Sequence, residues 1–113
     1  MLQELAMTSQ AFVATITQYG GDVLLCVLVA WCVHGFNVAC QYRLNILGIY
    51  PRHVFGLIGI VTSPWLHGNW AHLISNTLMF ILMSLFMLMQ GMVLYVLISV
   101  LIILMTGILV WLL

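Results

Sequence analysis

The stretch that decides the fold is residues 66–77, which read LHGNWAHLISNT. Its polar side chains stand at the start of an otherwise apolar segment that continues to about residue 89. His72 and Asn76 are four residues apart, which places them about 40° apart around a helix and about 6 Å apart along its axis. The spacing therefore predicts an imidazole and a carboxamide on one face of an apolar helix.

The composition is that of a membrane protein. Of the 113 residues, 65% are hydrophobic, and the only fixed charges are Glu4, Asp22, Arg43 and Arg52. A soluble domain needs roughly a quarter of its residues charged, so lipid is the solvent that tolerates this surface. Two scattered arginines cannot neutralise a row of phosphates, which argues against nucleic-acid binding.

Hydropathy and length predict three membrane-spanning helices. The first covers about residues 22–41, the second about 69–89 and the third about 92–113. Each is close to the 20 or so apolar residues that a bilayer crossing requires. The third ends without a polar flank, which leads us to expect that the natural chain continues beyond Leu113. The predicted class is an all-α, multi-pass membrane protein.

The residues before the first span differ from it. Residues 1–21 are mildly apolar, with Glu4 as their only charge, and predict a short interfacial helix. Gly20 and Gly21 are expected to end this helix, because paired glycines break helical patterns. Asp22 is the predicted N-cap of the first span.

The connection over residues 42–68 is both apolar and rich in helix breakers. The breakers are Gly48, Pro51, Gly56, Gly59 and Pro64. An irregular but apolar loop is expected to dip into the membrane beside protein, where its backbone can find partners. Both arginines lie in this loop, so the positive-inside rule places it on the cytoplasmic side.

His72 and Asn76 leave three chemical readings open. Two hydrogen-bond donors on one face could stabilise an oxyanion, hold a water molecule, or tie the helix to a neighbour. His67 lies about 140° from His72 in a continuous helix, so the two cannot chelate one metal ion from that helix. At the helix entrance His67 is expected to act as a cap. No metal or cofactor is predicted.

A nucleophile is missing from the sequence. None of the serines follows a glycine two places earlier, so no G-x-S motif occurs. Ser84 and Ser99 are expected to bond to backbone carbonyls of their own helices. The three cysteines form no C-x-x-C pair and are interpreted as packing residues.

Residues 40–80 resemble the rhomboid family of intramembrane serine proteases. His67, His72 and Asn76 fit the H-x-x-x-x-H-x-x-x-N pattern that opens the second helix of that family. The upstream segments LGIYPR (47–52), GLIGI (56–60) and PWLH (64–67) resemble the loop of its bacterial branch. Residues 22–113 would then be part of a rhomboid domain, three helices of a bundle of six or more around a water-filled cavity.

The resemblance implies roles for individual residues. His72 and Asn76 would line the oxyanion hole, and His67 would support the cavity mouth. Arg52 and Trp65 would anchor the loop at the outer leaflet, the opposite side from that given by the positive-inside rule. The catalytic Ser and His would come from helices beyond Leu113, so these 113 residues alone are expected to be inactive.

The resemblance implies an endopeptidase that cleaves other transmembrane proteins in a bacterial plasma membrane. Its partners would be those substrates and the lipid bilayer, and the sequence indicates no oligomeric state. Two alternatives stay open. The first is a catalytically inactive rhomboid relative that binds membrane clients, and the second is a small three-helix membrane scaffold.

Overall fold

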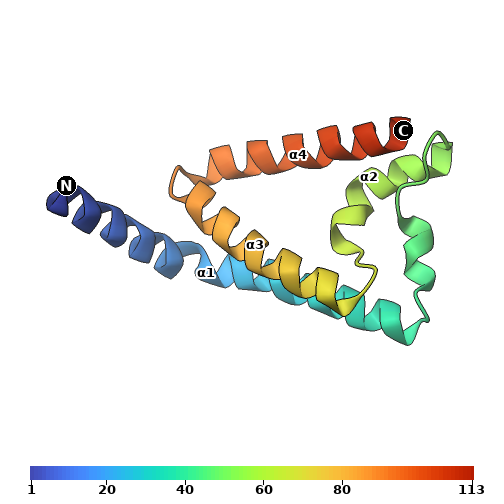
Figure 1. Ribbon diagram of the computed structural model, residues 1–113, viewed down its shortest axis with the longest axis horizontal. Helices are drawn as coiled ribbons and strands as arrows, with labels where there is room; N and C mark the ends of the chain where they lie inside the picture. The colour runs from blue at the N-terminus through green and yellow to red at the C-terminus, as the bar shows by residue number, and fades with distance from the viewer.

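The computed structural model describes every residue from 1 to 113 and consists of helices joined by turns (Figure 1). The elements in chain order are α1 (Leu2–Ala39), the 3-10 helices η1 (Arg43–Leu47) and η2 (Val54–Leu57), α2 (Ile58–Thr62), the 3-10 helix η3 (Ser63–Trp65), α3 (Trp70–Leu88) and α4 (Met92–Leu112). Helices α1, α3 and α4 are each long and apolar enough to cross a membrane. The predicted all-α class is confirmed, and the three predicted spans correspond to these three helices. Their place in a rhomboid-like bundle stays a prediction.

Helix α1 is longer than the sequence predicted. It runs without interruption through Gly20 and Gly21, so the expected break between an interfacial segment and the first span is wrong. Asp22 lies exposed inside this helix and is not its N-cap. Glycine costs only about 1 kcal/mol relative to alanine inside a helix, which flanking packing can offset.

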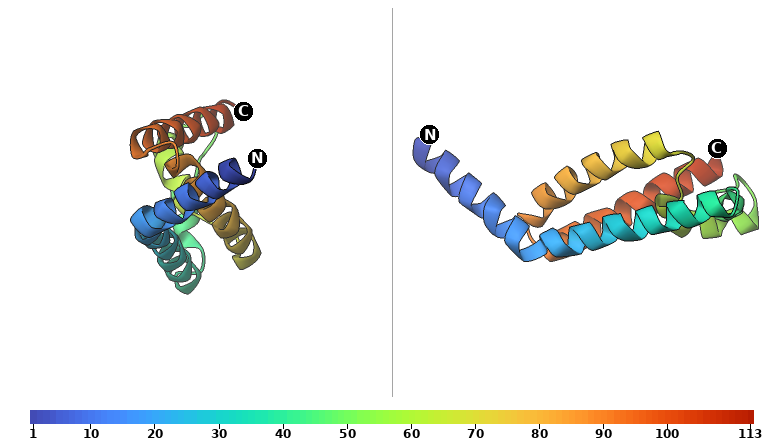
Figure 2. Two further views of the ribbon diagram at one scale, coloured as in Figure 1. Left: turned by 90° about the vertical axis from the view of Figure 1, so that its left-hand side faces the viewer. Right: turned by 90° about the horizontal axis from the view of Figure 1, so that it is seen from below.

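The glycine pair instead coincides with a bend. Figure 2 shows α1 changing direction near residue 20 of the colour bar. Gly-containing pairs are a recognised cause of helix kinks. The 38 residues of α1 would span about 57 Å if straight, nearly twice the hydrocarbon thickness of a bilayer. We therefore expect part of α1 to lie outside the hydrocarbon region, and the bend gives the two parts of the helix different directions.

Helix α3 runs back along α1 (Figures 1 and 2). Its N-cap is Asn69, whose side-chain oxygen accepts a hydrogen bond from the backbone N–H of His72 at 2.8 Å. Where α3 ends, the small core consists of Val23, Leu85 and Leu88. Along this contact the Nε1–H of Trp31 donates to the hydroxyl of Thr77 at 3.0 Å. Apolar packing and one polar bond thus fix α3 against α1.

Asn37 closes the end of α1. Its side chain is completely buried, and its Oδ1 accepts from the backbone N–H of Leu44 at 3.0 Å. Its Nδ2 donates to Oδ1 of Asn45 at 2.8 Å. Gln41 and Tyr42 have positive φ angles of 56° and 61°, so the chain turns sharply out of the helix. The buried carboxamide satisfies the polar groups that this turn exposes.

The connection between α1 and α3 is folded upon itself through glycines. A Cβ atom placed on Gly59 would lie 2.3 Å from the carbonyl carbon of Gly48. A Cβ on Gly107 of α4 would lie 2.5 Å from Cγ2 of Ile60, so the connection also packs closely on α4. What the sequence predicted as an irregular loop therefore contains short helical turns held by backbone contact.

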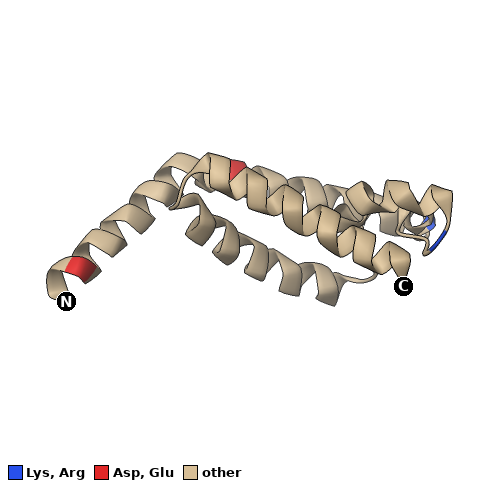
Figure 3. Ribbon diagram, turned by 90° about the horizontal axis from the view of Figure 1, so that it is seen from above, with Lys and Arg blue, Asp and Glu red and all other residues tan.

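The end of α4 is tied to the same connection by hydrogen bonds. The backbone N–H of Arg52 donates to the carbonyl of Trp111 at 2.8 Å, and its Nε–H donates to the carbonyl of Leu112 at 3.1 Å. The indole N–H of Trp111 donates to the carbonyl of His53 at 2.9 Å. Figure 3 shows both arginines at this end of the molecule, whereas the acidic residues lie along α1.

We predict that Gly59→Ala destabilises the protein by about 1–3 kcal/mol, the usual cost of forcing extra atoms into a filled space. Gly68→Ala is the matched control, since a Cβ there meets nothing within 4 Å. The measurement is the free energy of unfolding in mixed micelles, followed by circular dichroism. Equal stability of the two variants would contradict the close backbone approach.

A second prediction concerns Asn37. Asn37→Ala leaves the groups it bonds without partners and should cost about 1–3 kcal/mol in the same unfolding assay. Asn76→Ala is the control, because Asn76 is also a carboxamide on a spanning helix but is exposed. A comparable loss of stability in both variants would show that burial is not what distinguishes them.

Candidate functional site

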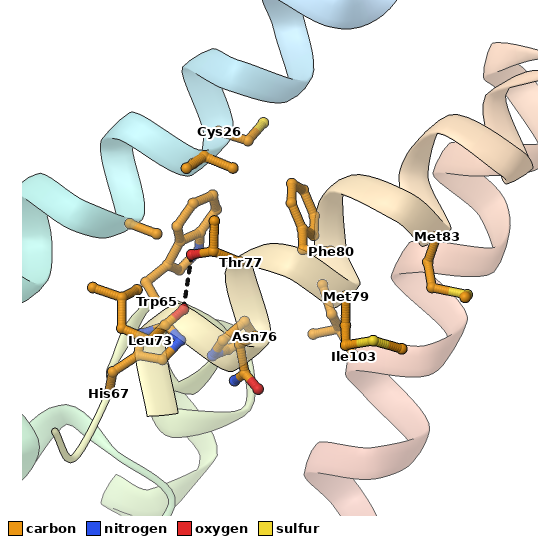
Figure 4. Close-up of a pocket in the computed structure, with 13 residues that line it drawn as sticks. Cys26, Trp65, His67, Leu73, Asn76, Thr77, Met79, Phe80, Met83 and Ile103 are labelled. Carbon is orange, nitrogen blue, oxygen red and sulfur yellow. Dashed lines mark hydrogen bonds between the residues drawn. The ribbon is translucent and has the colours of Figure 1, made fainter. Parts of the chain in front are cut away.

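A cavity of about 510 Å³ lies where α1, α3, α4 and the segment before α3 meet (Figure 4). Most of its lining is apolar. The lining residues are Cys26, Val27, Ala30, Pro64, Trp65, His67, Leu73, Asn76, Thr77, Met79, Phe80, Met83 and Ile103. Its volume falls within the range of small-molecule sites. A largely apolar cavity with a few polar side chains is the usual form of a binding site.

Asn76 is a polar residue of this cavity whose side chain has no hydrogen bond within the chain. Figure 4 shows Thr77 on the side of α3 nearer α1 and Asn76 on the other side of the helix. The hydroxyl of Thr77 is already committed to the carbonyl of Leu73 at 2.7 Å and to Trp31. Asn76 has no such bond within the chain, so both N–H groups of its carboxamide are open to a ligand.

His72 lies one turn before Asn76, toward the start of α3. Both belong to the same regular helix, so the predicted common face follows from helical geometry. His72 is exposed and is not among the residues that line the cavity. Its ring lies instead against that of His67, with the centroids 5.4 Å apart. The predicted pair is therefore assembled on one face, with Asn76 in the cavity and His72 beside His67.

His67 lines the cavity and also contacts the ring of His72 at the start of α3. It is 5% exposed and lines both the large cavity and a smaller one of about 210 Å³. It does not cap α3, a role that Asn69 fills. Burial lowers the pKa of His67 below the usual value of 6.5, a backbone hydrogen bond at Trp65 opposes this shift, and the neighbouring imidazoles of His72 and His34 add to it. The net shift favours the neutral imidazole of His67.

His34 is a residue that the sequence analysis did not single out. It lies on α1, is fully buried, and meets the ring of Trp70 edge to face at a centroid distance of 4.5 Å. Its ring is 6.2 Å from that of His67. The signal that could have found it is a lone imidazole in an apolar span, because polar groups at membrane depth usually face a partner.

The imidazoles do not form a metal centre. No group of three His, Cys, Asp or Glu side chains is arranged to hold an ion. His34 and His67 meet with an interplanar angle of 89°, and His67 and His72 with one of 73°. These are edge-to-face aromatic contacts rather than convergent ligands.

The two serines of α3, Ser75 and Ser84, have hydrogen-bond partners outside the cavity. The hydroxyl of Ser75 donates to the carbonyl of His72 at 3.0 Å. Ser84 pairs with the hydroxyl of Tyr95 on α4 at 3.2 Å, so the expectation that it bonds to its own helix is wrong. The reason is that α4 returns beside α3 and brings the hydroxyl of Tyr95 within hydrogen-bonding distance of Ser84. Neither hydroxyl is bonded to an imidazole.

The predicted loop anchors lie apart. Trp65 is 38% exposed and lines the cavity with part of its surface. Arg52 is exposed at the far end, bonded to the last carbonyls of α4. Their contact with lipid headgroups stays a prediction.

The comparisons with known proteins give relatives but no family. An uncharacterised protein of Mycobacterium bovis and two of Mycobacterium tuberculosis are each 32% identical to this chain over 72 residues. The matched segment is 64% of this chain and 30% of each relative. The chain thus spans less than a third of the length of the curated relatives it matches. No family model and no solved structure matches the chain.

The lowered pKa of His67 predicts a pH-dependent stability. Between 6.5 and the lower pKa of the folded state, the unfolded chain binds a proton that the folded chain does not. The free energy of unfolding should therefore be constant above pH 6.5 and fall as the pH decreases below it. Unfolding titrations at several pH values test this. His67→Gln should flatten the curve, whereas a curve unchanged by that variant would contradict the assignment.

Proposed function

We propose that this chain forms part of a rhomboid-type intramembrane serine endopeptidase, in which it supplies oxyanion-stabilising groups and one wall of the substrate cavity. The nucleophilic Ser and the catalytic His would be supplied by residues beyond Leu113. The observation that carries the proposal is the free carboxamide of Asn76 in the lining of a largely apolar cavity, one helical turn from His72.

The chemistry required of these two residues is simple. When a hydroxyl attacks an amide carbonyl, negative charge develops on the carbonyl oxygen, and N–H donors fixed beforehand stabilise it. A carboxamide offers two N–H donors, and a neutral imidazole offers one. Because the surroundings are apolar, such donors act in a low dielectric and have a larger effect than in water.

The cavity fits the proposed substrate class. A transmembrane segment offers mainly apolar side chains, which the methionines, Phe80 and Ile103 can contact. The polar groups of the cavity, His67 and Asn76, would meet the peptide bond that is exposed when a helix end unwinds. A cavity with both properties suits cleavage near the end of a substrate helix.

The proposed location is the plasma membrane of a bacterium. Three spanning helices support a multi-pass protein, and the matching relatives are mycobacterial. The inactive client-binding alternative uses the same cavity without chemistry. It is distinguished by whether the full-length protein contains a G-x-S-G motif and a later helical His.

In the full-length protein we expect Asn76→Ala to reduce the cleavage rate of a transmembrane reporter by about 10²–10³, the usual effect of removing one oxyanion donor. His72→Ala should lower the rate in the same way, with little change in substrate binding. The measurement is single-turnover cleavage in proteoliposomes.

Ser75→Ala is the matched control for this experiment. It lies next to Asn76 but about 100° around the helix, and its hydroxyl serves only a backbone carbonyl. Full activity of Asn76→Ala would rule out the oxyanion role. A full-length protein that binds the reporter without cutting it would favour the client-binding alternative.

A further inference from the structure

Three of the four histidines gather at one junction, although they come from three segments. His34 belongs to α1, His67 to the connection and His72 to α3. The ring centroids are 6.2 Å apart for His34 and His67 and 5.4 Å apart for His67 and His72. The chain thus places three imidazoles at the junction where α1 meets the start of α3.

Three buried ring nitrogens of this cluster lack hydrogen-bond partners. Neither ring nitrogen of His34 has a hydrogen bond, and neither has Nδ1 of His67. His34 is fully buried and His67 is 5% exposed. Buried polar atoms are nearly always paired in folded proteins, so an unpaired set marks a place where an alternative state can be favoured. Apolar and aromatic packing, with Trp70 closest to His34, holds the cluster closed.

No negative charge is available to stabilise protonated forms of these rings. Tyr42, whose ring is 6.1 Å from that of His34, carries no charge in acid. The only acids, Glu4 and Asp22, are exposed on the first part of α1, and Asp22 lies about 18 Å before His34 along that helix. The nearest fixed charge in the sequence is Arg43, which has the same sign as an imidazolium.

The helix dipole acts in the same direction. His72 is the third residue of α3, a helix of 19 residues, so it lies at the positive end of that helix. Cations are unfavourable there. From α1, from the connection and from α3, the groups that face the cluster are therefore other imidazoles, neutral aromatics or positive charge.

We propose that this histidine cluster is a proton-operated switch that opens the junction between α1 and the start of α3. When the imidazoles are neutral, they pack edge to face and keep the cavity wall closed. When protons from cavity water bind to them, the like charges repel and need water, so the first turns of α3 move away from α1. Because α3 carries Asn76, this movement widens the cavity at its polar end.

The switch does not depend on the proposed protease activity, because what it changes is the distance between α1 and the start of α3.

The test measures the distance between two nitroxide labels, which are attached to cysteines introduced by Phe36→Cys on α1 and Ile74→Cys on α3. Both positions are exposed, at 60% and 56%. The full-length protein is used in lipid nanodiscs, with Cys26, Cys32 and Cys40 replaced by serine. Double electron–electron resonance is recorded from pH 8 to pH 4.5.

We expect the label separation to shift to longer values as the pH falls from 8 to 4.5. His34→Gln should abolish this shift. His53→Gln is the matched control, because His53 stacks on Phe55 outside the cluster, and it should leave the shift unchanged. A separation that is constant with pH, or a shift that persists in His34→Gln, would overturn the proposal.

A second variant guards against failure of His34→Gln to fold. His67→Gln removes the central ring of the cluster from a segment outside the spanning helices and should also reduce the shift. A shift of wild-type size in His67→Gln would overturn the proposal. Loss of the pH response in His34→Gln with unchanged reporter cleavage would support the switch independently of the protease hypothesis, because His34 does not line the cavity.

Discussion

The contact between the start of α3 and the second half of α1 determines the positions of Asn76 and of the histidine cluster. Trp70 meets His34 edge to face and lies 5.9 Å from Trp31, centroid to centroid. Trp31 is in turn hydrogen-bonded to Thr77. These contacts are made by rigid aromatic rings, so they fix the direction of the first two turns of α3. Asn76 lies within those two turns, so the same contacts determine its position in the cavity lining.

The remaining wall of the site depends on close backbone approach. Where the connection folds back on itself, Gly56 and Gly59 let one segment of backbone lie directly against another. Gly107 likewise lets α4 pack directly against Ile60 of the connection. Dispersion contacts at such short range replace the hydrophobic driving force, which lipid does not supply. The hydrogen bonds between Arg52 and the end of α4 further hold the connection to that helix.

The polar side chains divide into two groups with different physical meaning. Asn37 is buried and fully engaged, as expected for a group that only holds the fold together. Asn76 is of the same residue type but is open to a cavity, and His34 is buried without a partner. In an almost uncharged membrane chain, unpaired polar groups carry a real free-energy cost. That cost is the physical ground for assigning function to these positions and not to Asn37.

The sequence by itself determined the class of protein, the three spanning segments and the common face of His72 and Asn76. Hydropathy and helical periodicity are local properties, and a nearly uncharged chain leaves little choice of solvent. Local rules misjudged Gly20, Gly21 and Asp22, because packing along α1 outweighs the weak preferences of a glycine pair and a capping residue. The burial of His34, its approach to His67 and the partner of Ser84 were decided by tertiary structure alone. Each depends on which residues of distant helices meet, and no local pattern encodes the position of a side chain contributed from elsewhere in the chain.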